Sequence, residues 1–118
     1  MMRLATYLDK LALSRTERDF QAQVIDLARL CGWRIAHFRP ARTERGWRTA
    51  VQGDVGWPDL VLCRPPVTLF RELKAEKGKL TDDQAAWLAW LAACGLDTDT
   101  WRPSDWPDIE AALASRRR

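Results

Sequence analysis

Three ionisable residues, Asp59, Glu72 and Lys74, have a spacing that could bring their side chains together. Two runs with the apolar character of strands, residues 59–63 and 67–74, flank an Arg-Pro-Pro turn, which predicts an antiparallel hairpin. If the turn is centred between its two prolines, Asp59 lies opposite Glu72, and directly opposed side chains have Cβ atoms about 5 Å apart. Lys74 projects from the same face of the strand as Glu72 because side chains two residues apart share a face.

This group of side chains has the chemistry of a metal site that hydrolyses a phosphodiester. Two adjacent carboxylates repel each other unless a cation joins them. Carboxylate oxygens suit Mg²⁺ or Mn²⁺, and a nearby lysine can help to activate a water or stabilise charge that develops on a phosphate. The competing interpretation is that Glu72 and Lys74 are only the exposed charges of a strand, since an E-x-K triplet also occurs by chance.

The elements that must position these residues follow from apolar periodicity and from the placement of glycine and proline. We expect a helix from about Thr16 to Cys31, whose apolar side chains from Phe20 onward fall on one face and which ends at Gly32. The remaining expected elements are a strand at 33–38, a helix at 81–93, a strand at 97–101 and a last helix that starts at Ser104 or Trp106. The resulting order, α-β-β-β-α-β-α, predicts an α/β fold with a mixed central sheet flanked by helices.

The length of 118 residues predicts one domain, 1–118. Residues 1–13 form a variable N-terminal segment in which a short helix would be marginal. Residues 40–56 have no clean period and contain three glycines, so we expect a long basic loop, which in a compact domain points to function. Residues 115–118 form a basic tail.

The net charge of +3 hides an uneven distribution. Four arginines and one glutamate give residues 39–48 a charge of +3, and the last three arginines add +3, which leaves −3 on the rest of the chain. Basic side chains before and after the carboxylates could contact phosphates without reading sequence. These candidates for DNA contact are Arg39, Arg42, Arg45, Arg48, Lys77 and Lys79. The alternative is that the arginines keep a solvated loop soluble.

Composition excludes several other classes of protein. Hydrophobic residues make up 47% and charged residues 30%, as in a soluble globular protein. The three cysteines include no CxxC pair and there is one histidine, which argues against a zinc site or a disulfide scaffold and for a reducing compartment. The absence of a signal-type segment, a long apolar run and a Gly-rich phosphate loop predicts a cytoplasmic protein with no membrane partner and no nucleotide cofactor.

The sequence around the three ionisable residues resembles the PD-(D/E)xK nuclease superfamily and, more narrowly, the VRR-NUC family. The segments that carry the resemblance are GDVGWPDL at 53–60, FRELK at 70–74 and GKLTDDQ at 78–84. The family pattern is G-x-P-D, then E-x-K, then a glutamine that opens the next helix. The resemblance implies a restriction-endonuclease-like core and a Mg²⁺-dependent DNA endonuclease, with Mn²⁺ able to substitute. It further implies a branched or otherwise structured DNA substrate, as for Holliday-junction resolvases.

The family's functional residues can be carried over to matching positions in this chain. The resemblance implies that Asp59, Glu72 and the Leu73 backbone carbonyl hold the metal and that Lys74 is the catalytic lysine. It also implies that Glu17 reaches the metal from the first helix and that Gln84 orients the lysine or a phosphate. For the last two residues the alternative is a helix cap, because Ser14–Glu17 and Thr81–Gln84 both fit a capping box.

The C-terminal third is rich in tryptophan, at Trp87, Trp90, Trp101 and Trp106. Core packing is expected for them, although so many large aromatics in a small domain also suggest that a partner subunit covers some. A homodimer with two-fold symmetry would suit branched DNA. The competing functional class is a DNA-binding or assembly module that keeps this fold without cleaving. An intact set of Asp59, Glu72 and Lys74 argues against that class.

Overall fold

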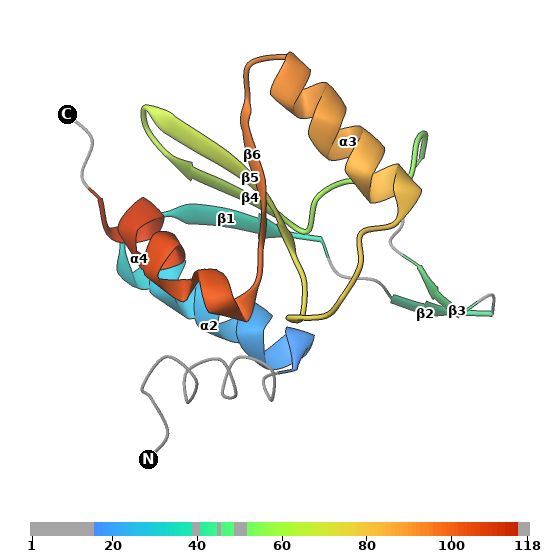
Figure 1. Ribbon diagram of the computed structural model, residues 1–118, viewed down its shortest axis with the longest axis horizontal. Coiled ribbons are helices and arrows are strands. Elements are labelled where there is room, and N and C mark those ends of the chain that lie inside the picture. The colour runs from blue at the N-terminus through green and yellow to red at the C-terminus, as the bar shows by residue number, and fades with distance from the viewer. Residues whose placement is uncertain (1–15, 39–40, 45, 49–51, 116–118) are drawn as a thin grey trace.

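The computed structural model describes residues 16–38, 41–44, 46–48 and 52–115 (Figure 1). Its elements, in chain order, are α2 (Glu17–Leu30), β1 (Arg34–His37), β2 (Ala41–Thr43), β3 (Gly46–Arg48), β4 (Leu60–Arg64), β5 (Val67–Leu73), α3 (Asp82–Ala93), β6 (Asp97–Trp101), a 3₁₀ turn (Pro103–Asp105) and α4 (Trp106–Ala114). The predicted α/β fold class is confirmed, and so is the order α-β-β-β-α-β-α of the elements that build and flank the main sheet.

In the described part of the chain, the main sheet has four strands in the order β1-β4-β5-β6. β1 pairs with β4 and β4 pairs with β5 in antiparallel fashion, whereas β6 is parallel to β5. A parallel pair needs a crossover connection, and α3 supplies it between β5 and β6. The β4–β5 register runs from Arg64↔Val67 to Leu60↔Arg71, which is the register that the turn predicted.

The hydrophobic core lies between one face of the sheet and the pair of helices α2 and α4 (Figure 1). Leu69 and Leu73 of β5 point into it, and burial of each such side chain stabilises the fold by roughly 1.5–3 kcal/mol. Trp101 from β6 is also buried there, whereas Trp90 on α3 is 75% exposed. The expectation that the C-terminal tryptophans pack in the core therefore holds for Trp101 and is wrong for Trp90.

Helix α2 begins where its apolar pattern predicted, at about Thr16, and later than the capping-box alternative that starts at Ser14. Thr16 is the N-cap, because its hydroxyl accepts a hydrogen bond from the Asp19 backbone N–H at 3.0 Å. Glu17 is then the first helical residue rather than the third residue of a box opened by Ser14, so this capping interpretation of Glu17 is wrong. Ser14 itself lies outside the described residues.

The interpretation of residues 40–56 as one long loop is also wrong in part. Strands β2 and β3 form a separate two-stranded antiparallel ribbon within it, with Arg42 paired to Trp47. Their three-residue lengths are too short to produce a readable alternation. The predicted N-terminal segment 1–13 and the arginines of the C-terminal tail lie outside the described residues. Across the ranges that the structure covers, no helix is both long and apolar enough to cross a bilayer.

Candidate active site

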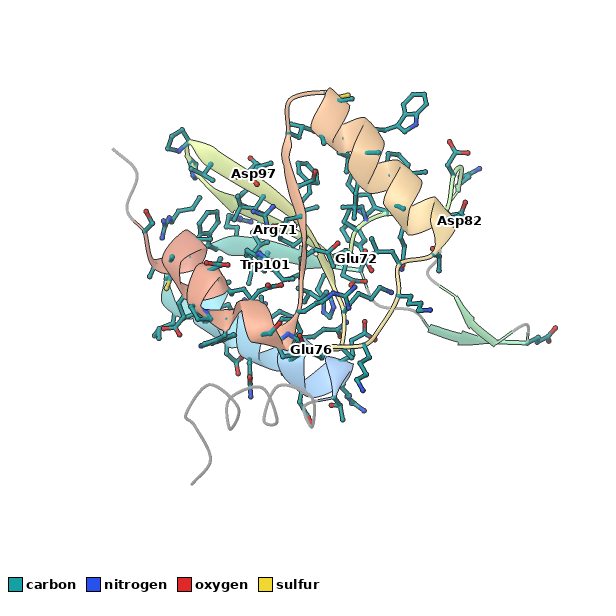
Figure 2. The ribbon with its side chains drawn as sticks, in the orientation of Figure 1. Arg71, Glu72, Glu76, Asp82, Asp97 and Trp101 are labelled. Atoms are coloured by element: carbon teal, nitrogen blue, oxygen red, sulfur yellow. The ribbon has the colours of Figure 1, made fainter. Side chains whose placement is uncertain are left out.

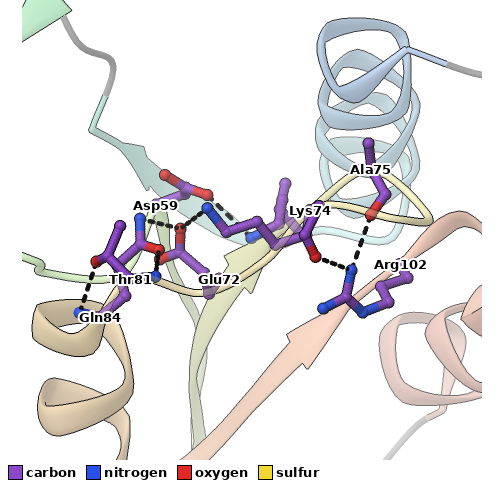
Figure 3. Close-up of polar contacts among 9 residues, drawn as sticks. Asp59, Glu72, Lys74, Ala75, Thr81, Gln84 and Arg102 are labelled. Carbon is purple, nitrogen blue, oxygen red and sulfur yellow. Dashed lines mark hydrogen bonds and ion pairs between the residues drawn. The ribbon is translucent and has the colours of Figure 1, made fainter.

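Asp59 lies immediately before β4, one position beyond the last β4–β5 pair, and its carboxylate points to β5 (Figure 3). The Leu73 backbone N–H donates a hydrogen bond to Asp59 Oδ2 at 2.9 Å. The Asp59 carbonyl accepts from the Phe38 backbone N–H at 2.8 Å, which extends the β1–β4 pairing to this residue. The hairpin therefore fixes Asp59 at both its main chain and its side chain.

Glu72 is the most buried acid of the site, with 2% of the residue exposed. Its Oε1 atom accepts a hydrogen bond from Gln84 Nε2 at 3.1 Å and lies 3.9 Å from Lys74 Nζ. The pKa of Glu72 is raised to about 8, first by burial and then by repulsion from the Asp59 carboxylate and a hydrogen bond shared with that group. The attraction of Lys74 acts in the opposite direction but does not offset burial. The structure thus brings the predicted triplet together.

Glu17, at the start of α2, is close enough to the triplet to feel its charges. Burial is the largest cause of the raised pKa of Glu17; the attraction of Lys74 lowers this pKa and repulsion from Asp59 raises it. A helix on the core side of the sheet therefore contributes a third carboxyl group to the same electrostatic environment. The structure places Glu17 beside the predicted site and removes its capping alternative.

Gln84 makes the predicted helix cap and also contacts the site, where its partner is Glu72 and not the predicted lysine or phosphate. Its Oε1 accepts from the Thr81 backbone N–H at 2.9 Å, and its backbone N–H donates to the Thr81 hydroxyl at 3.1 Å, which completes a capping box. Its Nε2 group donates to Glu72 (Figure 3). An amide carries a donor and an acceptor at once, so one side chain closes the N-terminus of α3 and holds a site carboxylate.

Arg102, which directly follows β6, is a residue that sequence reasoning missed. Its guanidinium Nη1 donates to the carbonyls of Ala75 at 2.8 Å, Gly78 at 2.6 Å and Glu76 at 3.3 Å (Figure 3). These carbonyls belong to the turn that leads from Lys74 toward α3, so Arg102 holds the chain on the far side of the catalytic lysine candidate. No local pattern marks this arginine, because its partners lie more than twenty residues away in the sequence.

An aromatic cluster supports the strand that delivers Asp59. Trp57 packs edge-on against Phe38, Phe70 and Trp87, with ring centroids 6.4, 5.8 and 5.0 Å away. Pro58 follows it and is fully buried. A proline also holds the residue before it in an extended conformation, so this packing and Pro58 together fix the chain that leads to Asp59.

The donor set of the site fits a hard divalent cation. The carboxyl groups of Glu72 and Glu17 both interact with the Lys74 ammonium group, and both have a raised pKa partly because of repulsion from Asp59. A bound cation would relieve that repulsion, and carboxylate oxygens are the ligands that Mg²⁺ uses in proteins. Among the residues described, no three His, Cys, Asp or Glu side chains lie close enough to hold one ion together. Asp59 and Glu72 are thus the side chains that could hold it, with main-chain or water oxygens and with Glu17 farther away.

The predicted DNA-contacting residues are only partly described. Lys77 and Lys79 are exposed on the turn that follows Lys74. Arg42 lies in β2 and Arg48 in β3, so both belong to the separate ribbon. Arg39 and Arg45 lie outside the described residues.

A carboxylate pair and a lysine at the end of a mixed sheet, with helices on both faces, fit the restriction-endonuclease-like class of nuclease. The sequence matches the VRR-NUC domain family over residues 6–102, most of the chain, and the chain belongs to that family. It is therefore a nuclease-type domain, for which DNA is the implied substrate. The family resemblance drawn from the sequence is confirmed. No curated protein shows significant similarity to the chain.

Proposed function

We propose that this protein is a Mg²⁺-dependent endonuclease that hydrolyses phosphodiester bonds in branched or otherwise structured DNA. The observation that carries the proposal is the pairing of the half-buried Asp59 with the buried Glu72, two acidic groups that raise the pKa of Glu72 by mutual repulsion beside Lys74. A protein that only bound DNA would have no use for two carboxylates that repel both each other and a phosphate.

Each residue of the site has a separate task in this proposal. Mg²⁺ bound by Asp59 and Glu72 would lower the pKa of a water and offset charge on the phosphate, and Mn²⁺ should substitute. The Leu73 N–H and the Gln84 amide hold these carboxylates in position. Lys74 projects beside them and would stabilise negative charge as it develops on the phosphate.

The preference for branched DNA and the use of two copies are the finer parts of the proposal. They are supported by family membership and by the basic positions on both sides of the carboxylates in the sequence. Branched DNA has approximate two-fold symmetry, so a homodimer would place one site on each of two strands. Light scattering of the protein alone and bound to a four-way junction would measure the number of copies.

The function can be tested with one panel of labelled DNA substrates. Purified protein is incubated with a four-way junction, a flap, a single strand and a linear duplex, each in Mg²⁺, Mn²⁺ or EDTA. Glu72→Ala and Lys74→Ala are run beside the native protein. Glu110→Ala is the matched control, because Glu110 is an exposed carboxylate on α4.

We expect cleavage of the junction or flap in Mg²⁺ and Mn²⁺ by the native protein and by Glu110→Ala only. Cleavage that survives in EDTA, or in both site variants, would contradict the metal-dependent mechanism. Binding without cleavage under every condition would instead support the non-cleaving module. Equal cleavage of all four substrates would retain the nuclease and remove the preference for branched DNA.

A further inference from the structure

A hollow of about 320 Å³ lies next to the proposed active site, between α3 and the segment before Asp59. Its volume is at the lower end of the range of small-ligand sites, roughly 300–1,000 Å³. The residues that line it are Asp54, Val55, Asp83, Ala86, Trp87 and Trp90. Its walls are thus two tryptophans and two small apolar side chains, and the lining also includes two aspartates.

The segment that forms one wall is fastened to α3. The Trp87 indole N–H donates to the Asp54 carbonyl at 3.2 Å. Gly56 has a φ of +100°, and a Cβ at this position would lie 2.6 Å from the Asp83 carbonyl carbon. Only glycine permits both the left-handed conformation and this close approach. The hollow is consequently part of the folded structure and not a gap beside a loose loop.

The hollow and the carboxylate site share the helix α3. Asp83, Ala86 and Trp90 form one row along this helix at spacings of three and four residues, adjacent to the row that begins with Gln84. Gln84 bonds to Glu72, and Trp90 lies about 9 Å farther along the helix axis at 1.5 Å per residue. Two or three stacked nucleotides, at about 3.4 Å each, span that distance.

We propose that the hollow binds an unpaired nucleobase of the DNA strand within about three nucleotides of the cleaved bond. This inference rests on the proposed function and adds a base-recognition site to it. Trp90 is 75% exposed and offers a ring face on which a base can stack. The aspartates at the hollow disfavour a phosphate but accept hydrogen bonds from base N–H groups, as Asp does from cytosine N4. The charge of the lining therefore selects a base edge in preference to the backbone.

The test measures binding in EDTA, so that it does not depend on cleavage. The probes are fluorescein-labelled oligo(dC), oligo(dT) and a fully abasic strand of equal length, which carry the same phosphate charge. The variants are Trp90→Ala, Trp90→Phe and Asp54→Asn combined with Asp83→Asn. Leu30→Ala is the control, because Leu30 is 85% exposed and lies at the opposite end of α2 from Glu17.

We expect the native protein and Leu30→Ala to bind oligo(dC) most tightly, then oligo(dT), then the abasic strand. Trp90→Ala should weaken binding of oligo(dC) roughly 5- to 150-fold, the range for one stacked base, and leave the abasic strand unaffected. Trp90→Phe should retain most of the affinity, and the double asparagine variant should lose the preference for oligo(dC).

Two results would overturn the proposal. One is equal affinity of the native protein for oligo(dC) and the abasic strand, even if the protein cleaves DNA in Mg²⁺. The other is a change from dimer to monomer in Trp90→Ala on sedimentation with no change in base dependence, which would assign the hollow to a second copy of the chain. If instead base-dependent binding is found without any cleavage, the proposed function fails and the base site stands.

Discussion

Arg71 and Glu72 are neighbours on β5, are 5% and 2% exposed, and point to opposite faces of the sheet (Figure 2). Arg71 meets opposite charge and acceptors: its Nη2 lies 2.8 Å from Asp97 Oδ1, its Nη1 donates to the Asp97 carbonyl, and its guanidinium lies 4.7 Å above the Trp101 ring. Among the described residues, the Nε atom of Arg71 is the only buried side-chain nitrogen or oxygen that has no hydrogen-bond partner.

Glu72 meets the opposite situation. Its nearest acidic neighbour is Asp59, its ammonium neighbour is 3.9 Å away, and its pKa is raised to about 8 by burial and by Asp59. The two buried side chains therefore differ in how far the protein stabilises their charged forms. Arg71 is a structural residue because its charge is paired within the fold. Glu72 differs because Gln84 and Lys74 stabilise its carboxylate only in part, and its pKa stays raised.

Removal of the lysine should give the largest effect and affect only chemistry. Lys74→Met should reduce the rate of cleavage at saturating DNA about 10²–10³-fold, the usual cost of removing one group that stabilises transition-state charge. The unfolding free energy should change little, because the attraction between Lys74 and Glu72 offsets only part of the cost of burying Glu72. Single-turnover cleavage and urea unfolding measure the two quantities. A native cleavage rate in this variant would exclude Lys74 from the reaction.

The equivalent change on the other face should affect stability instead. Arg71→Met should lower the unfolding free energy by about 3 kcal/mol, since it leaves the Asp97 groups without their cation. Because Asp97 is half exposed, water solvates its carboxylate after the pair is broken. The loss of unfolding free energy therefore lies at the lower end of the values for a broken buried ion pair. Urea unfolding measures this value, and the folded variant should cleave DNA at the native rate. A variant with native stability that does not cleave DNA would show that Arg71 acts in the reaction and not in the fold.

The raised pKa of Glu72 should make the stability of the metal-free protein sensitive to alkali. Because the pKa of Glu72 is about 8 in the folded protein and near 4.5 when unperturbed, the folded state binds this proton more tightly. The resulting stability is complete below about pH 4.5 and disappears as the pH rises through about 8. We expect a loss on the order of 2 kcal/mol between about pH 6.5 and 9 in EDTA, which Glu72→Gln should largely abolish. An unchanged pH profile in that variant would be inconsistent with the raised pKa.

The smallest effect should come from the exposed lysines beyond the site. Lys77→Gln combined with Lys79→Gln removes two exposed charges from the turn after Lys74. The slope of log affinity against log salt should become less steep by about 1.8, and the cleavage rate at saturating DNA should not change. Fluorescence anisotropy across a salt series measures the slope. An identical slope would remove this turn from the path of the DNA.

The hairpin and its carboxylates could be predicted because they depend on local sequence. The two-proline turn sets the β4–β5 register, and that register alone places Asp59 opposite Glu72. The role of Gln84 could not be decided in the same way. A glutamine at the third position of α3 fits a helix cap and a site contact equally well. In the structure the Gln84 amide makes both contacts, through its oxygen and its nitrogen.

Other features depend on contacts between distant segments. The clamp of Arg102 on three carbonyls and the hollow beside Trp90 arise only when β6 and α3 return to the site. The ribbon of β2 and β3 was missed for a different reason, because three-residue strands are too short to show a period. The capping-box pattern pointed to Ser14, whereas the apolar face placed the start of the helix at about Thr16, which is the N-cap.

The central claim is that the fold leaves the charge of Glu72 for a divalent cation to satisfy. The most direct test is thermal unfolding at pH 9 in EDTA and in Mg²⁺, for the native protein, Glu72→Gln and the surface control Glu110→Gln. A ligand that binds only the folded state raises the unfolding temperature. We predict that Mg²⁺ raises this temperature for the native protein and Glu110→Gln but not for Glu72→Gln. No increase in the native protein, or an equal increase in Glu72→Gln, would contradict the claim.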